Sequence, residues 1–366
     1  AKWDGMTWSA FGAGFGATDN PTWLYVYEII RFDDGGGAQL CVGGTFKVID
    51  NTSIVSIARW TGDSWQAVGD ALLGWGPDPA YVPMIGALTN WNVGGEPALF
   101  VGGSFDGAGS VVSKCVLVRR NSLWDSLGDD IAYQIPGGFA PTVADAVVFA
   151  ASPGVEHLYA AGSFSEAPAG KFARWNGTTW EYFAGFDGYP NKANKSIFDL
   201  QVYDDGSGPA LFACGVFVTI KPLDGSPNVL ANCVFKWDGT AFHGLGGGFG
   251  GTYAYPGRAD AMQSYDDGVG QALYVGGYFE TAGPYTVNGI AKWGCIPGDL
   301  NCDGSFDLFD IEPFALALGS AFHAEPFDDY YAAFPDCHAG RADVNEDGVV
   351  DLFDIDPFVV RLGEEW

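Results

Sequence analysis

The sequence predicts an all-β chain with a small helical end: a five-bladed β-propeller of four-stranded blades at 1–294, followed by a small α calcium-binding domain at 295–366. Three observations lead to this expectation. A short apolar motif recurs five times, Gly accounts for 54 of the 366 residues, and acidic residues concentrate toward the C-terminus. Frequent Gly is typical of tight turns and hence of β-structure.

The repeated motif contains Gly or another small residue and closes on Phe. A second motif with paired aromatic residues, such as IARWTGDSW, follows it, and a DDG turn precedes it in three copies. Asp-Gly between alternating apolar runs is a hairpin signal, because Gly supplies the positive φ that the turn requires. Each unit therefore predicts four strands, and such units in series are typical of propeller blades. The five copies are VGGTF (42–46), VGGSF (101–105), AAGSF (160–164), ACGVF (213–217) and VGGYF (275–279).

The two ends of the repeat region depart from this pattern. The chain opens with AKWDGMTWSAFG (1–12), which corresponds to a third and a fourth strand, whereas the fifth unit (260–293) has no fourth strand. The strand around Trp8 can therefore complete the fifth blade and close the ring, which leaves the strand around Trp3 surplus. The alternatives are that the N-terminal pair lies along an edge, or that it completes the open blade of a neighbouring molecule.

These repeats resemble the extracellular propeller repeats of bacterial surface proteins and of fungal cortical polarity-marker proteins, over nearly all of 1–294. The resemblance implies the fold and says little about function, since propellers host many activities.

The charge balance restricts the classes of partner. The chain has 17 basic and 45 acidic residues, a net charge of −28, which argues against nucleic acid or an anionic membrane surface as the main partner. No apolar run approaches the roughly 18 residues of a membrane span. Residues 295–366 alone hold 17 acidic and 2 basic residues. A segment this acidic is either disordered or binds cations.

Two 12-residue segments of this acidic part share one pattern, DLNCDGSFDLFD (299–310) and DVNEDGVVDLFD (343–354). Oxygen ligands for Ca²⁺ belong at positions 1, 3, 5, 7, 9 and 12 of such a loop, with Gly at position 6 for the sharp turn. Both segments fill every position, so the sequence predicts two Ca²⁺ ions. The predicted ligands are Asp299, Asn301, Asp303, the Ser305 carbonyl, Asp307 and Asp310 in the first loop, and Asp343, Asn345, Asp347, the Val349 carbonyl, Asp351 and Asp354 in the second.

This pair of loop–helix repeats resembles a type I dockerin, and Asp at position 12 fits that family. The resemblance implies two calcium ions, folding coupled to metal binding, and a cohesin-like protein partner. Positions 10 and 11 carry partner recognition in the family, and here they are Leu308 with Phe309 and Leu352 with Phe353. The alternative for these four residues is helix packing within the domain. The long spacing of the loops also resembles the dockerin-like ends of planctomycete surface proteins, where they are thought to anchor the protein.

The cysteines suggest one disulfide. Cys302 and Cys337 bracket the insert between the two loops and are the predicted pair, with Cys295 as a competing partner for either. Cys214 and Cys233 could also pair, whereas we expect Cys41 and Cys115 to be buried thiols.

The motifs of common catalytic sites are missing from the sequence, which has no GxSxG elbow, HExxH motif or P-loop. We therefore expect a non-catalytic protein of the extracellular space or cell surface, in which the propeller is a platform and the calcium module docks it onto a protein partner. One alternative is a subunit of a self-assembling surface filament, joined by strand exchange or tail contacts to sister subunits. Another is a glycan-binding or hydrolytic propeller that the dockerin delivers to a complex.

Overall fold

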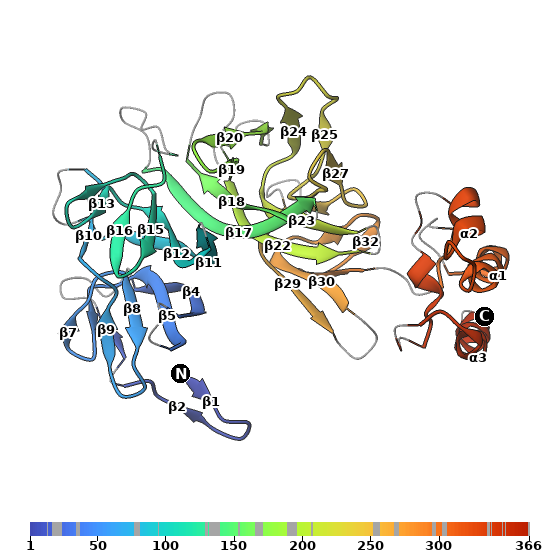
Figure 1. Ribbon diagram of the computed structural model, residues 1–366, viewed down its shortest axis with the longest axis horizontal. Helices are drawn as coiled ribbons and strands as arrows, with labels where there is room; N and C mark the ends of the chain where they lie inside the picture. The colour runs from blue at the N-terminus through green and yellow to red at the C-terminus, as the bar shows by residue number, and fades with distance from the viewer. Residues whose placement is uncertain are drawn as a thin grey trace.

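The structure is a computed structural model of the chain (Figure 1). It describes residues 1–12, 14–16, 24–33, 37–76, 81–93, 95–128, 131, 140–152, 154–164, 171–188, 196–205, 208–251, 257–266, 271–294, 298–301, 306–334, 337, 339–345, 347 and 349–364.

Most of the described chain is β-structure, and a small helical part follows at the C-terminal end, as predicted. Five antiparallel sheets follow one another along the chain, and in each the neighbouring strands pair in chain order. Their orders are β4-β5-β8-β9, β11-β12-β15-β16, β17-β18-β19-β20, β22-β23-β26-β27 and β29-β30-β33. The fifth sheet therefore has three strands where the others have four.

The bounds of these strands follow the repeats. The first strands are β4 (Tyr25–Phe32), β11 (Met84–Val93), β17 (Thr142–Ser152), β22 (Ser196–Asp204) and β29 (Arg258–Asp266). The second strands are β5 (Gln39–Thr45), β12 (Glu96–Ser104), β18 (Val155–Ser163), β23 (Pro209–Val216) and β30 (Gln271–Tyr278). The third strands are β8 (Ile57–Trp60), β15 (Val116–Arg120), β19 (Phe172–Trp175), β26 (Val234–Trp237) and β33 (Ile290–Trp293). The fourth strands are β9 (Trp65–Ala67), β16 (Leu123–Asp125), β20 (Trp180–Tyr182) and β27 (Phe242–Gly244).

Four small three-stranded sheets tie the end of one repeat to the hairpin of the next. They are β3 (Phe15–Gly16) with β6 (Val48–Ile49) and β7 (Thr52–Ser53); β10 (Leu72–Leu73) with β13 (Gly107–Ala108) and β14 (Val111–Val112); β21 (Ala184–Asp187) with β24 (Thr219–Pro222) and β25 (Val229–Leu230); and β28 (Phe249–Gly250) with β31 (Thr281–Ala282) and β32 (Tyr285–Thr286).

The second Gly of the repeated motif has a steric cause. A Cβ added at this position would lie only 1.9 to 2.2 Å from a backbone carbonyl oxygen at the start of the sheet's first strand. Only Gly lets the two strands approach so closely beside the β-bulge that each first strand contains. The same constraint operates in all five sheets, at Gly44, Gly103, Gly162, Gly215 and Gly277.

The first strands pack one against the next, from β4 through β11, β17 and β22 to β29, and the apolar clusters lie between consecutive sheets. In Figure 1 the sheets follow an arc from β4 to β29. Among the described strands, β29 does not pack along β4 in the same way, so no closed ring is observed. The Phe residues that close the five motifs are all buried: four lie in the clusters between sheets, and Phe46 lies in a separate cluster of the first repeat.

The expected closure by the strand around Trp8 is not observed. Strand β2 (Trp8–Ser9) pairs with β1 (Lys2–Trp3), with Trp3 opposite Trp8, and with no other described strand. The Asp4 carboxylate accepts hydrogen bonds from the backbone N–H groups of Met6 and Thr7 in the turn. A short local loop costs less conformational entropy to close than a pairing across nearly the whole β-region, which favours this local hairpin.

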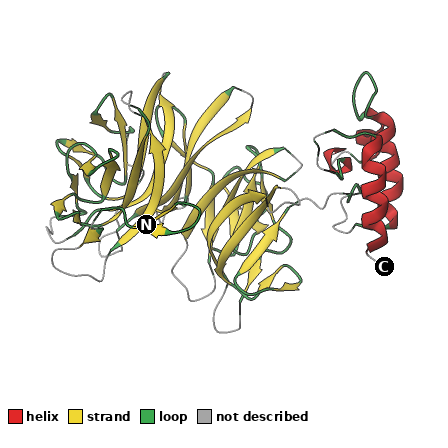
Figure 2. Cartoon of the chain, turned by 90° about the horizontal axis from the view of Figure 1, so that it is seen from below, coloured by secondary structure: helices red, strands yellow, loops and turns green. Residues whose placement is uncertain are grey.

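The C-terminal part is a small helical unit that Figure 2 shows beyond one end of the sheets. Its elements are η1 (Leu308–Asp310), α1 (Ile311–Ser320), α2 (Asp328–Ala333), η2 (Ala339–Ala342), η3 (Leu352–Asp354) and α3 (Ile355–Glu364). Helices α1 and α3 lie side by side and are joined by the stacked rings of Phe314 and Phe358, whose centroids are 4.0 Å apart. In the part of the chain that the structure describes, no helix is both long and apolar enough to span a membrane.

Candidate functional site

The two predicted calcium loops end in the same local structure. In the first, the Asp307 carboxylate accepts a hydrogen bond from the Phe309 backbone, and the Asp310 carboxylate accepts one from the Asp307 backbone, at 2.8 and 2.9 Å. Asp351 and Asp354 repeat both bonds in the second loop at the same distances. These reciprocal caps satisfy the free N–H groups at the start of each helix. The same residues that the sequence pattern predicts as metal ligands therefore also cap the start of a helix.

The position-12 carboxylates close each loop onto its own beginning. Asp310 is fully buried, and its Oδ1 accepts hydrogen bonds from the backbone N–H groups of Leu300 and Asn301 at 2.7 and 3.1 Å. Asp354 is also fully buried and makes the same bonds to positions 2 and 3 of the second loop. Because a carboxylate has about four acceptor positions and three are used, one remains on each for an ion.

Side-chain oxygens of the second loop converge on one turn. The Asp347 N–H donates to Asp343 Oδ1 at 3.1 Å and to Asn345 Oδ1 at 2.9 Å, so these two oxygens lie close together. Asp347 Oδ1 accepts a hydrogen bond from the Val349 N–H at 2.9 Å. The side chains at positions 1, 3 and 5 all offer oxygen atoms as metal ligands, and Ca²⁺ prefers such hard oxygen ligands. The residues of this loop therefore fit a calcium ion by their chemistry.

The first loop differs at position 1. The Asp299 side chain is almost fully buried, and its Oδ2 lies 3.1 Å from Nη1 of Arg341, one of the two basic residues of the acidic part. This ion pair offsets part of the negative charge of the first loop. The predicted ligands Asp303 and Ser305 lie outside the described residues.

The four residues predicted to contact a partner are all on the surface. Leu308, Phe309, Leu352 and Phe353 are between 51% and 77% exposed, so packing within the domain does not account for them. The domain core uses Phe314 and Phe358 instead. Since the pairs occupy equivalent positions at the starts of two equivalent helices, the domain presents the same apolar pair twice.

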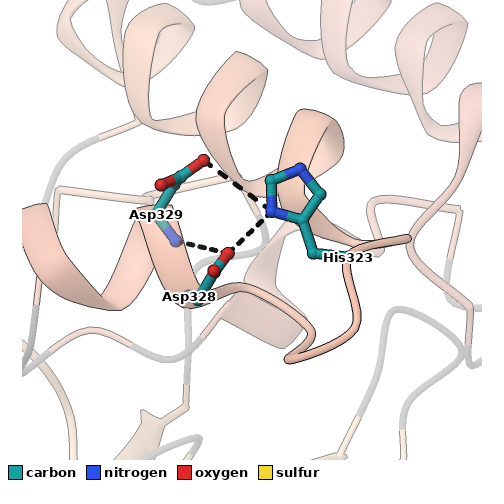
Figure 3. A group of neighbouring side chains, drawn as sticks. All are labelled: His323, Asp328 and Asp329. Carbon is teal, nitrogen blue, oxygen red and sulfur yellow. Dashed lines mark hydrogen bonds and ion pairs between the residues drawn. The ribbon is translucent and has the colours of Figure 1, made fainter.

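A third acidic group lies between α1 and α2 (Figure 3). His323 Nδ1 is 2.7 Å from Asp328 Oδ1 and 3.8 Å from Asp329 Oδ2, and all three side chains are exposed. The hydrogen bond from His323 lowers the pKa of the Asp328 carboxyl. Sequence reasoning missed this group, although its spacing of five and six residues is visible. These contacts are those of a turn that leads into α2.

A cavity of about 510 Å³ lies where the five first strands meet. Its lining includes Glu28 from β4, Asp145 from β17 and Asp199 from β22, which occupy equivalent positions at the β-bulges. Burial raises the pKa of all three carboxyls, and the Asp199 charge further raises those of Glu28 and Asp145. A side-chain hydrogen bond with Asp199 further raises the pKa of the Asp145 carboxyl.

Two of these carboxyls, Asp145 and Asp199, also link neighbouring sheets. Asp145 Oδ2 accepts a hydrogen bond from the Leu200 N–H of the next sheet at 2.7 Å, and Asp199 Oδ2 accepts one from the Met262 N–H of the sheet after that at 2.5 Å. The sequence signal was their equivalent position in the repeats. It was missed because two of the five copies have Ala there.

The described cysteines of the β-region are free thiols. Cys41 and Cys115 are buried, as expected, and Cys214 and Cys233 do not pair, contrary to the possibility raised by their neighbouring strands. The Cys233 thiol instead donates to the Gly257 carbonyl at 2.9 Å, as Cys115 does to Pro141 and Ser56 does to Pro83. Each thiol or hydroxyl thereby links its sheet to the chain entering the next sheet.

In the C-terminal part, Cys337 is disulfide-bonded. Both predicted partners, Cys302 and the competing Cys295, lie outside the described residues, so the pairing stays a prediction.

Comparison of the chain with protein-family models and with curated proteins finds no match. The functional argument therefore rests on the residues themselves.

Proposed function

We propose that this chain is a non-catalytic extracellular or cell-surface interaction protein. Its five sheets serve as the blades of a propeller-like platform, and its C-terminal part is a dockerin-like module that binds two calcium ions and docks onto a protein partner. The observation that carries the proposal is the exposed Leu-Phe pair, which occurs at the same position of both loops and does not belong to the apolar core of the domain.

Exposed aromatic and aliphatic pairs are costly to leave in water unless a partner covers them. Phe309 and Phe353 project from helix starts whose geometry is fixed by the caps of Asp307 and Asp351. A rigid, repeated apolar pair suits a partner with one matching groove, which could then bind the module in either of two orientations. The partner class is a folded protein domain of the cohesin type.

The loop carboxylates would hold calcium, and the ions would supply positive charge to a domain with an excess of negative charge. Fifteen net negative charges in this part repel one another, and two divalent cations would offset four of them while joining each loop to its helix. The buried Asp310 and Asp354 would each contribute one oxygen in the observed arrangement. Millimolar external calcium and a disulfide at Cys337 both favour a place outside the cell.

The docking proposal can be tested with the intact chain and an immobilised cohesin-type domain. Replacing both pairs with Asp (L308D/F309D/L352D/F353D) should abolish binding, whereas replacing one pair should weaken it only about two-fold, because either face suffices. The control is V112D, a similarly exposed position in β14. Binding that survives the fourfold replacement would refute the assignment of this surface, and loss of binding with V112D would show that the assay reports folding.

A second candidate function is a small-ligand or hydrolytic site in the cavity between the first strands. The observation in its favour is the set of carboxyls with raised pKa, Glu28, Asp145 and Asp199, which face a cavity large enough for a sugar unit. Glycan binding or glycoside turnover by the intact chain that disappears in E28Q would support it. No binding or turnover across a glycan panel would contradict this second function, and Asp145 and Asp199 would then have only a structural role, as links between sheets.

A further inference from the structure

The first and the last sheet each leave uncovered a surface that the sheets between them bury. In β4, Val26 and Ile29 are 40% and 57% exposed. The equivalent positions in the other four first strands are 7% exposed or less, because they pack on the preceding sheet. These equivalents are Ile85 and Leu88, Val143 and Ala146, Ile197 and Leu200, and Ala259 and Met262.

The last sheet exposes the surface on which the first strand of a following sheet would pack. A Cβ added to Gly43 would lie 2.5 Å from Ile85 of the following sheet, and one added to Gly102 would lie 2.6 Å from Val143. At the equivalent Gly276 nothing lies within 4 Å. Ile290, opposite Gly276, is 61% exposed, whereas its equivalents in the other sheets are 3% exposed or less. Among the described residues, no equivalent of Val26 therefore packs against Gly276.

The N-terminal hairpin carries the strand that the last sheet lacks. Phe11, just after β2, packs against Trp60 and Trp65 of the first sheet, with ring centroids 5.0 and 5.9 Å apart. This is the place that the end of a preceding fourth strand takes in later repeats, where Trp293 packs over Gly246. Trp3 lies opposite Trp8 in the register that joins Trp60 to Trp65.

The sequence of β1 explains how β2 can change partners. Residues 1–3 and 291–293 are both Ala-Lys-Trp, so β33 can offer β2 the same side chains that β1 offers now. The exchange would replace an exposed two-residue strand by a four-residue strand that already belongs to a sheet. The register of the complete sheets then places Trp8 opposite Trp293 and Ser9 opposite Lys292.

We propose that a second copy of this chain covers the last sheet: Val26 and Ile29 of one copy pack at Gly276 and Ile290 of the next, and β2 of the first pairs with β33 of the second. Among the described residues of one chain, β4 and β29 line the same cavity but do not pack along each other as neighbouring first strands do, and Figure 1 shows the two sheets at the two ends of the arc. Because the contact joins two different surfaces, each added copy covers one surface and presents the same surface again at the end of the assembly, so copies add head to tail and the assembly stays open unless successive rotations close a ring. The inference rests on the sheets acting as blades and is independent of calcium docking.

The experiment mixes two variants of the intact chain that each carry one added cysteine, S9C and K292C, and follows disulfide-linked dimers on a non-reducing gel. Cross-strand Cα separations of about 4.5 to 5.5 Å fall within the range that a disulfide bridges. We expect a covalent dimer from the mixture and none when V112C replaces K292C. The double variant S9C/K292C tests the competing closure within one chain. A cross-linked monomer without dimer in the mixture, or no cross-link in either sample, would overturn the proposal.

A second measurement does not depend on cysteines. Gly276 has open space around it, so G276V should fold as a single chain but fill the position that Val26 of the next copy would occupy. Light scattering should show that the molar mass of the wild type grows with concentration, whereas that of G276V stays at one copy. A wild type that is monomeric at all concentrations would contradict the inference. A failure of partner docking with the same concentration-dependent molar mass would contradict the proposed docking function and leave this assembly proposal standing.

Discussion

The β-region and the C-terminal part reach a folded state by different means. The sheets bury large apolar side chains between them, among them the fully buried Phe164 and Phe217, and even the polar links between sheets are mostly to backbone groups. The helical part has a small core around Phe314 and Phe358 and holds its loops through carboxylates. From this difference we expect the sheets to fold without an ion, and the stability of the helical part to depend on neutralising its negative charge.

The largest expected effect is in the core between the sheets. Phe217 is fully buried against Phe186 and Phe235, with ring centroids 5.5 and 5.6 Å apart. F217A should lower the free energy of unfolding of the β-region by about 3 to 5 kcal/mol, through lost burial and the cavity that remains. Denaturant unfolding followed by Trp fluorescence measures it. The loss should be the same in calcium and in chelator, and a loss seen only in chelator would break the distinction between the two regions.

The next effect should be confined to the helical part. Asp354 is buried and accepts three backbone hydrogen bonds, and the amide nitrogen of Asn cannot accept any of them. D354N should therefore cost the module about 1.5 to 3 kcal/mol, with the unfolding of the sheets unchanged. The control is D356N, an exposed residue on the same helix. Calorimetry of the intact chain separates the two transitions, and equal effects of D354N and D356N would argue against the loop-closing role.

A smaller effect concerns the pH dependence of the sheets. Burial and the Asp199 charge raise the pKa of the Asp145 carboxyl in the folded state. The folded protein then keeps a proton that the unfolded chain releases, so this group's contribution is fully present below the usual Asp pKa of about 3.9 and is lost as the pH rises toward the folded-state pKa. Thermal unfolding from about pH 4 to neutrality should show this decline, and D145N should reduce it. An unchanged slope in D145N would show that other groups cause the decline.

The smallest effect should be at the docking surface. F309A and F353A remove exposed side chains, so each should change stability by less than about 0.5 kcal/mol. Their effect belongs to partner binding, where each alone should be mild and both together severe. A large loss of stability in either variant would mean that these rings pack within the module.

The sequence carried more information about the repeats than about their ends. Motif spacing predicted the strand order of each sheet, and the second Gly of the motif, as at Gly103, has a local steric cause that is visible in the pattern. The pairing of β2 was not predictable, because residues 1–3 and 291–293 are both Ala-Lys-Trp and either segment offers β2 the same side chains.

The candidate site shows the same limit. The loop pattern predicted where the short helices η1 and η3 begin, since Asp307 and Asp351 cap them, and α1 and α3 follow directly. It could not tell whether Leu352 and Phe353 point to the core or to water, because two adjacent apolar residues at a helix start fit either. The cavity carboxyls depend on bulges that bring Asp145 and Asp199 from different repeats together, a relation that exists only in three dimensions.

The central claim is that the acidic loops bind calcium, and titration calorimetry of the intact chain tests it most directly. The account predicts two ions bound per chain, one ion in D347A, and no comparable binding of Mg²⁺, because these loops suit a larger and more flexible coordination sphere. Undetectable calcium binding at millimolar concentrations, or a stoichiometry of two in D347A, would contradict the account and leave the carboxylates of both loops as helix caps alone.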